Sequence, residues 1–162
     1  LETGKVELDA TEKAPLQDLF ALFGRLAQRA VPTAARSIDE IQRIHPPILA
    51  FEQYIKGLLA ETPGTAINYL NGALESDPTL ERARLALWEV YDEQGEHERA
   101  LATVLRVAST APQVRRAQFR AGLSLLQLER YEQAFNTFKA LNDVRSTPAL
   151  LNNLGVVQLR RG

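Results

Sequence analysis

Residues 81–114 read ERARLALWEVYDEQGEHERALATVLRVASTAPQV, and this pattern predicts two helices joined by a tight turn. Apolar side chains recur at helical spacing in the first half of the stretch, and again over Glu98–Val107. The intervening Gln94-Gly95-Glu96 predicts a break, because glycine readily adopts the backbone conformations of turns. We expect Asp77 to be the N-cap of the first helix, with Pro78 at its first helical position.

Small and bulky residues recur along the chain at a spacing of 34 positions. Residues at this spacing include Ala66, Ala100 and Ala134, then Pro78 and Pro112, and finally Trp88 and Gly122. A single helical hairpin leaves one apolar face uncovered, so it must stack on a neighbouring hairpin to form a core. The spacing therefore predicts a repeated helical hairpin rather than one globular helix bundle.

The period and the small residues resemble those of the tetratricopeptide repeat family. The second unit carries the family pattern through Leu87, Trp88, Tyr91, Gly95, Ala100 and Pro112. Trp88 departs from the glycine or alanine usual at its position, and we expect it to widen the contact between helices there. The turn of the first unit, Glu61–Gly64, is expected to be short.

The resemblance implies an all-α fold, a right-handed solenoid of antiparallel helix hairpins over residues 47–162. Its expected units are 47–80, 81–114, 115–148 and a truncated fourth, 149–162. We expect the helix of the fourth unit, Ala149–Arg161, to expose Leu150, Leu154 and Val157 unless another part of the protein covers them.

Residues 1–46 lie outside the repeats. Pro15–Ala30 has the apolar periodicity of one amphipathic helix, and Thr3–Leu8 alternates like a short strand. Ser37–Glu40 matches a capping box, which predicts a short helix that ends at His45. The motifs Thr3-Gly4-Lys5 and Asp18-Leu19-Phe20 are similar to the end of TolB-like domains, which precede tetratricopeptide repeats in some bacterial proteins. We interpret residues 1–46 as the remnant of a preceding domain. The absence of methionine suggests a piece of a longer protein.

Composition and motifs argue against several classes of function. The chain has no cysteine and a net charge of −1, so thiolate metal sites are excluded and nucleic-acid binding is not expected. Its longest uncharged stretches are too short to cross a membrane, so we expect no membrane insertion. There is no Gly-rich phosphate loop or nucleophile elbow, and His45 and His97 lack the spacing of paired metal ligands. We predict no catalytic site, cofactor or metal.

The family resemblance implies a binding surface instead, because the first helix of each repeat lines a concave groove. The candidate partner-binding residues, taken by register, are Tyr54, Arg82, Glu89, Arg116, Phe119, Arg120 and Asn153. They give the groove an aromatic end, an acidic middle and an end that combines basic and amide side chains.

Arg116 and Arg120 allow two interpretations. They are four residues apart on one helix face, so their guanidinium groups can grip a carboxylate together, with the amide of Asn153 adding a contact. Alternatively, they pair with Glu89 and its acidic neighbours across the groove. We favour the internal pairing.

The predicted function is a non-catalytic scaffold that binds a peptide or protein segment in the groove. The alternative is a self-association or spacer module of a larger bacterial protein. Residues 1–112 hold 11 basic and 17 acidic residues, net −6, whereas residues 113–162 hold 8 and 3, net +5. This asymmetry favours weak head-to-tail association.

Overall fold

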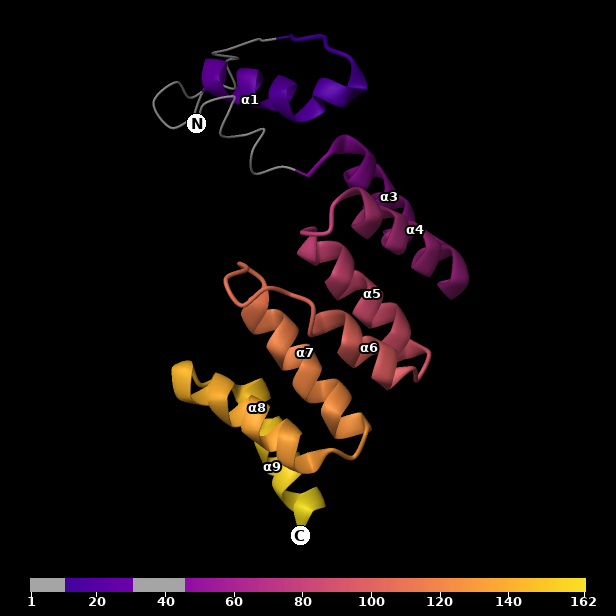
Figure 1. Cartoon of the computed structure of the whole chain (residues 1–162). Helices are drawn as coiled ribbons and strands as arrows, with labels where there is room; N and C mark the ends of the chain where they lie inside the picture. Colours follow the sequence, from indigo (N-terminus) through magenta and orange to yellow (C-terminus); the bar gives the residue numbers. More distant parts are fainter. Residues whose placement is uncertain (1–10, 31–45) are drawn as a thin grey trace, which may run out of the picture.

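The computed structural model describes residues 11–30 and 46–162, and over these ranges it is helical with no strand. The main array consists of α3 (Ile48–Leu58), α4 (Pro63–Ser76), α5 (Glu81–Glu93), α6 (His97–Val104), α7 (Val114–Gln127), α8 (Tyr131–Val144) and α9 (Pro148–Arg161). Each of these helices packs on the next in sequence, and the array progresses from α3 at one end to α9 at the other (Figure 1). The predicted all-α solenoid of helical hairpins is confirmed. None of the described helices is both long and apolar enough to span a membrane.

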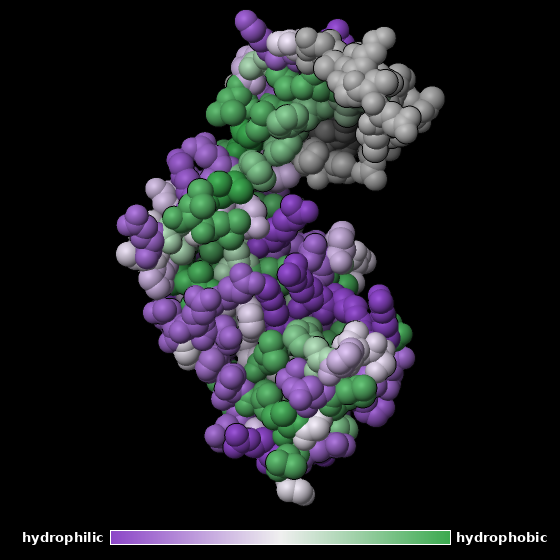
Figure 2. All heavy atoms as spheres, turned by 180° about the vertical axis from the view of Figure 1, so that it is seen from behind, coloured by the Kyte–Doolittle hydropathy of each residue, from purple (hydrophilic) through white to green (hydrophobic). Residues whose placement is uncertain are grey.

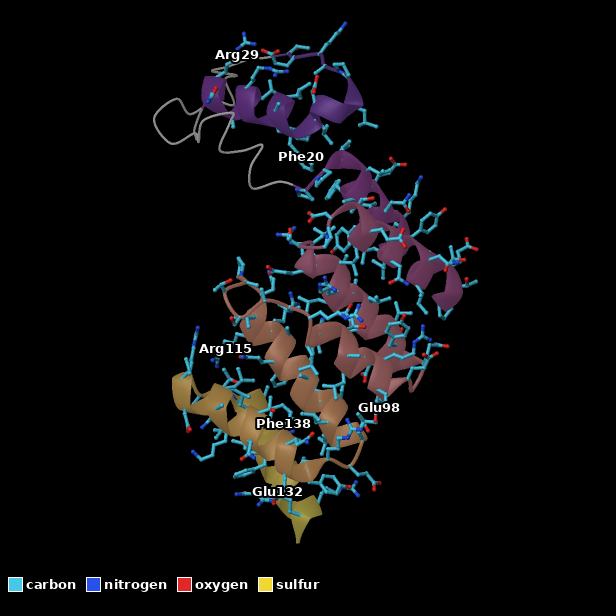
Figure 3. All side chains as sticks on the ribbon, viewed as in Figure 1. Phe20, Arg29, Glu98, Arg115, Glu132 and Phe138 are labelled. Carbon is cyan, nitrogen blue, oxygen red and sulfur yellow. The ribbon has the colours of Figure 1, made fainter. Side chains whose placement is uncertain are left out.

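A separate helix precedes the array. One 3-10 turn, Leu16–Asp18, leads into α1 (Leu19–Ala30), so the amphipathic helix expected from Pro15 is present with a tighter first turn. In Figure 3, Phe20 lies on the side of α1 that faces α3, and its ring meets that of Phe51 edge to face, with centroids 5.4 Å apart. The predicted strand and the predicted helix ending at His45 lie outside the described residues.

Two helices begin with the same Thr-Pro dipeptide. Thr62 accepts a hydrogen bond from the backbone N–H of Thr65 at 3.3 Å, and Thr147 accepts one from Leu150 at 3.3 Å. The following proline occupies the first turn of α4 and of α9, where its missing N–H costs nothing. The turn between α3 and α4 therefore ends at Thr62, and its predicted extension to Gly64 is wrong.

Asp77 ends α4 instead of starting α5. Its Oδ1 accepts hydrogen bonds from the backbone N–H of Thr79 at 2.9 Å and from the Thr79 hydroxyl at 2.7 Å. An aspartate that bonds two residues ahead forms a turn of its own, which competes with helix initiation. Helix α5 starts only at Glu81, after Leu80, so the prediction that Asp77 caps it is wrong.

Close helix contacts depend on two glycines that face large side chains. A Cβ atom added to Gly122 in α7 would lie 2.5 Å from Cε1 of Phe138, and one added to Gly57 in α3 would lie 2.7 Å from Cγ of Leu70. Phe138 is fully buried, and Leu70 is nearly so. In each hairpin, therefore, a glycine on the first helix leaves room for a large side chain on the second.

In the hairpin of α5 and α6 the large residue is on the first helix and the smaller one on the second. Trp88 of α5 stands 34 positions before Gly122, and Val104 of α6 stands 34 positions before Phe138. Trp88 is buried, and its indole Nε1–H donates to Ser124 Oγ of α7 at 2.8 Å. The large side chain of α5 thus reaches the following hairpin. The expected widening of the helix contact at Trp88 stays a prediction.

Helix α9 packs on α8 through the face that carries Leu150, Leu154 and Val157. Leu150 is 3% exposed and Val157 is fully buried, because α9 packs on α8 along this face. Leu154 is half-buried against the same core. These three residues were expected to be exposed only if nothing covered them, and α8 covers them. The exposed apolar residues of α9 are Leu151, Val156 and Leu159.

Candidate functional site

Two hollows adjoin one another on the face formed by α3, α5 and α7. The first, about 630 Å³, is lined by residues that include Phe20, Phe51, Tyr54, Arg82 and Pro112. The second, about 360 Å³, is lined by residues that include Pro112, Arg116, Phe119, Thr147 and Leu150. Pro112, just before α7, borders both hollows. Figure 2 shows hydrophobic side chains gathered towards each end of the molecule, with a hydrophilic band between.

The first hollow brings together aromatic rings from two helices and the guanidinium group of Arg82. Phe20 and Phe51 meet at its wall, and the half-buried Tyr54 follows one turn after Phe51 on α3. Arg82, at the start of α5, is exposed and has no ion-pair partner among the described residues. Of the predicted groove residues, Tyr54 and Arg82 thus share this hollow.

The second hollow repeats the combination on α7. Phe119 is half-buried, and its ring is tilted against that of Phe138 with centroids 5.6 Å apart. Arg116, one turn earlier on α7, is exposed and forms no ion pair within the described part of the chain. Arg116 and Phe119 therefore join a positive charge to an apolar wall.

Arg120 is buried beneath this face, so its guanidinium is not accessible to a ligand as that of Arg116 is. The residue is 9% exposed, and its guanidinium donates to the Glu89 carboxylate and to the backbone carbonyl of Leu85. The guanidinium also lies 4.9 Å from the centroid of the Trp88 ring. Burial lowers the pKa of Arg120, and the Glu89 carboxylate opposes that shift. The internal pairing expected for Arg120 with Glu89 is present, whereas Arg116 does not share it.

Ser124 completes this polar cluster and was not among the predicted residues. It is fully buried, and it accepts the hydrogen bond of the Trp88 indole. Trp88, Glu89 and the Leu85 carbonyl belong to α5, while Arg120 and Ser124 belong to α7. The sequence offers one signal for it, a lone serine within the apolar run Leu123–Leu126.

Asn153 stands apart from both hollows. Its Nδ2 donates to the backbone carbonyl of Ala149, 2.8 Å away, in its own helix. The structure thus places Tyr54, Arg82, Arg116 and Phe119 in two adjoining hollows, Glu89 and Arg120 in an ion pair, and Asn153 on α9.

The described residues contain no group of three or more His, Cys, Asp or Glu side chains placed to hold a metal ion. His97 begins α6, and its Nδ1 lies 3.0 Å from Asp92 Oδ1.

Comparison with known families identifies the repeats. Residues 58–126, from the end of α3 to the last turn of α7, match the family model described as tetratricopeptide repeat. No curated protein matches the chain. The resemblance of the first thirty residues to TolB-like domains stays a prediction.

Proposed function

We propose that the chain binds a peptide segment across α3, α5 and α7, because residues 58–126 match the tetratricopeptide repeat and such repeats generally mediate protein–protein interaction. Repeats of this type are typically non-catalytic, and the proposal requires no chemistry beyond recognition. The segment is extended, and it places apolar side chains in the two adjoining hollows.

The observation that carries the proposal is that each hollow combines an aromatic residue with an arginine that forms no ion pair with another described residue. Tyr54 accompanies Arg82 in one, and Phe119 accompanies Arg116 in the other. Aromatic and arginine side chains are the residues most often found at binding hot spots. We therefore expect a ligand with two apolar anchors and an acidic residue beside at least one of them.

The ion pair of Arg120 with Glu89 supports this function indirectly. It joins α5 to α7 and fixes the helices that carry the two hollows. A surface held in place before binding loses less conformational entropy when the ligand arrives, so more of the contact energy appears as affinity. We infer that Arg120 and Glu89 position the surface and do not contact the ligand.

The test selects peptides from a random displayed library against the wild-type chain and measures their affinity for variants. Arg116→Glu reverses a charge in the second hollow, and Tyr54→Ala removes an anchor from the first. Arg160→Glu, an equal charge change in the last turn of α9, is the matched control. We expect Arg116→Glu and Tyr54→Ala each to weaken binding about tenfold or more, with no effect of Arg160→Glu.

Two results would refute the proposal. One is selected peptides that bind all four proteins equally while the variants keep their helical circular dichroism. The other is selected peptides with no preference for apolar or acidic residues, since the hollows supply a reason for both.

Self-association is a second candidate, favoured by the open face of α9. Leu151, Val156 and Leu159 are exposed together, and the two ends of the chain carry opposite charge. A second copy can cover these residues in a head-to-tail contact. Light scattering at high concentration and low salt tests it. A monomer under those conditions contradicts association, and a dimer that Leu159→Glu disrupts supports it.

A further inference from the structure

A third hollow, separate from the proposed peptide surface, lies among α4, α5 and α6. Its volume is about 210 Å³, and no acidic side chain lines it. Its polar lining consists of Asn71, Arg84, Tyr91, Arg99, Thr103 and Arg106. Three guanidinium groups around so small a space leave an excess of positive charge.

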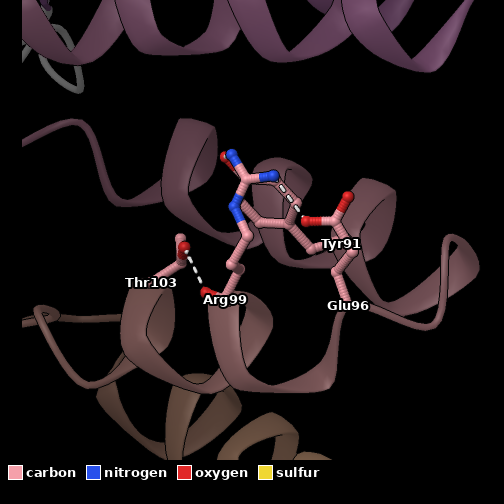
Figure 4. Close-up of polar contacts among 4 residues, drawn as sticks. All are labelled: Tyr91, Glu96, Arg99 and Thr103. Carbon is pink, nitrogen blue, oxygen red and sulfur yellow. Dashed lines mark hydrogen bonds and ion pairs between the residues drawn. The ribbon is translucent and has the colours of Figure 1, made fainter.

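One of the three arginines has its own counter-charge. Arg99 pairs with the Glu96 carboxylate, and it donates a further hydrogen bond to the Tyr91 hydroxyl at 3.0 Å. Its guanidinium stacks over the Tyr91 ring, 4.3 Å from the centroid. Figure 4 shows this group, with the Thr103 hydroxyl bonded to the backbone carbonyl of Arg99. Arg99 therefore lines the hollow, but its charge is neutralised by Glu96.

The other two arginines have no such partner. Arg84 donates one hydrogen bond to the backbone carbonyl of Pro78 at 2.7 Å, which fixes its guanidinium but does not neutralise it. Within the described residues, neither Arg84 nor Arg106 pairs with a carboxylate. Burial, followed by the positive charge of Arg106, lowers the pKa of Arg84. Arg84 is half-buried and Arg106 is exposed, and the proximity of two like charges costs free energy that a bound anion reduces.

We propose that this hollow binds a tetrahedral oxyanion of the phosphate class, held by Arg84 and Arg106 with the Asn71 amide beside them. Arg84 lies in α5 and Arg106 lies in the turn after α6, and their guanidinium groups together offer more donors than the two oxygens of a carboxylate accept. A phosphate group offers three terminal oxygens, and arginine matches them in bidentate fashion. The size of the hollow suits a single small anion rather than a peptide side chain with its backbone.

The ligand chemistry has two possible sources, a free phosphate ion or a phosphate ester on a peptide. Both present the same oxygens to Arg84 and Arg106. The ester adds a short stretch of chain outside the hollow. The experiment therefore compares inorganic phosphate with a short phosphoserine peptide.

The test follows backbone amide resonances of the chain during titration with inorganic phosphate, with chloride at matched ionic strength as reference. We expect saturable shifts around Arg84 and Arg106 with phosphate only. Arg106→Gln should weaken phosphate binding about tenfold or more, because it removes one of two charge-assisted contacts. The matched control is Arg145→Gln, an equal charge change at the end of α8.

The side chain of Arg106 makes no hydrogen bond or ion pair within the described residues, so its substitution is expected to leave the fold intact. Unchanged fluorescence of Trp88 verifies this. The proposal is overturned if phosphate shifts no more resonances than chloride, or if Arg106→Gln and Arg145→Gln weaken binding equally. A phosphoserine peptide that binds more tightly than inorganic phosphate, with the same loss in Arg106→Gln, supports the site and identifies the ester as its source.

Discussion

Replacement of Gly122 by alanine tests how closely α7 and α8 must pack. The added Cβ would lie 2.5, 2.7 and 3.0 Å from Cε1, Cζ and Cδ1 of the Phe138 ring. Phe138 is fully buried, so its ring has no free space into which it can turn. The helices must separate, or the ring must leave its preferred rotamer.

The magnitude follows from two opposed terms. Alanine is about 1 kcal/mol more favourable than glycine inside a helix. Overpacking of a core costs typically about 1–3 kcal/mol and sometimes more, and three ring atoms are involved here. Contact with three ring atoms places the overpacking cost near the upper end, about 3 kcal/mol. After subtraction of the gain in helix propensity, about 1 kcal/mol, we expect Gly122→Ala to lower the free energy of unfolding by about 2 kcal/mol.

The matched control is Gly155→Ala on α9. Gly155 is helical and exposed like an ordinary surface position, and a Cβ there would meet nothing within 4 Å. The same substitution should therefore raise stability by about 0.5–1 kcal/mol, through helix propensity alone. The two variants differ only in what surrounds the added methyl group.

The assay is urea unfolding followed by the fluorescence of Trp88, the one tryptophan of the chain, and by circular dichroism. Using both probes also shows whether the repeats unfold together. A Gly122→Ala variant as stable as wild type, or one that shifts in the same direction as Gly155→Ala, would refute the account of this contact. A second variant, Gly122→Ala with Phe138→Leu, should be less destabilised than the sum of the single changes.

Three further outcomes are expected. Ser124→Ala leaves the buried Trp88 indole N–H without its acceptor and should cost about 1–3 kcal/mol, measured by urea unfolding and by faster exchange of the indole proton. Glu89→Gln removes the counter-charge of the buried Arg120; we expect a loss of about 1–2 kcal/mol. Glu89 itself is half exposed, so part of this loss should be screened, and a thermal shift that shrinks in high salt checks it. Thr62→Ala should lower stability by about 1 kcal/mol through the lost N-cap, and Thr62→Ser, which keeps the hydroxyl, should restore most of it.

The repeat was predictable because small residues recur at the positions where its helices pack together. Ala66, Ala100 and Ala134 are all buried at the same spacing, and that spacing is visible without any structure. Gly122 stands at the same 34-residue spacing from Trp88, and it leaves room for the Phe138 ring. Period and residue size therefore indicated both the hairpins and their stacking.

The predictions that failed concern helix starts, where turn formation and helix formation compete for the same residues. Asp77 and Thr62 both precede a proline and both suit an N-cap, yet only Thr62 starts a helix. Asp77 bonds to Thr79 and makes a turn, which periodicity does not reveal. Which apolar residues of α9 are exposed was also not predictable, because they are spread around the helix and the sequence alone does not say which of them meets α8.

That the candidate residues form a binding surface stays a prediction, and register did not reveal their internal arrangement. Register along the repeats placed Tyr54, Arg82, Arg116 and Phe119 on the first helices, and these residues line the hollows. Register does not distinguish Arg116 from Arg120, four positions later. Their different burial depends on Trp88, whose ring and neighbouring carbonyl give Arg120 a place to lie.

The contacts between α5 and α7 have a consequence for how the molecule comes apart. In a linear array of repeats, the end units fray independently when the coupling between neighbours is weak. Here Trp88 and Arg120 link α5 and α7 directly, past the intervening helix α6, through a buried hydrogen bond and an ion pair. The second and third hairpins should therefore exchange their amide protons with solvent as one cooperative block, while α3 and α9 open first.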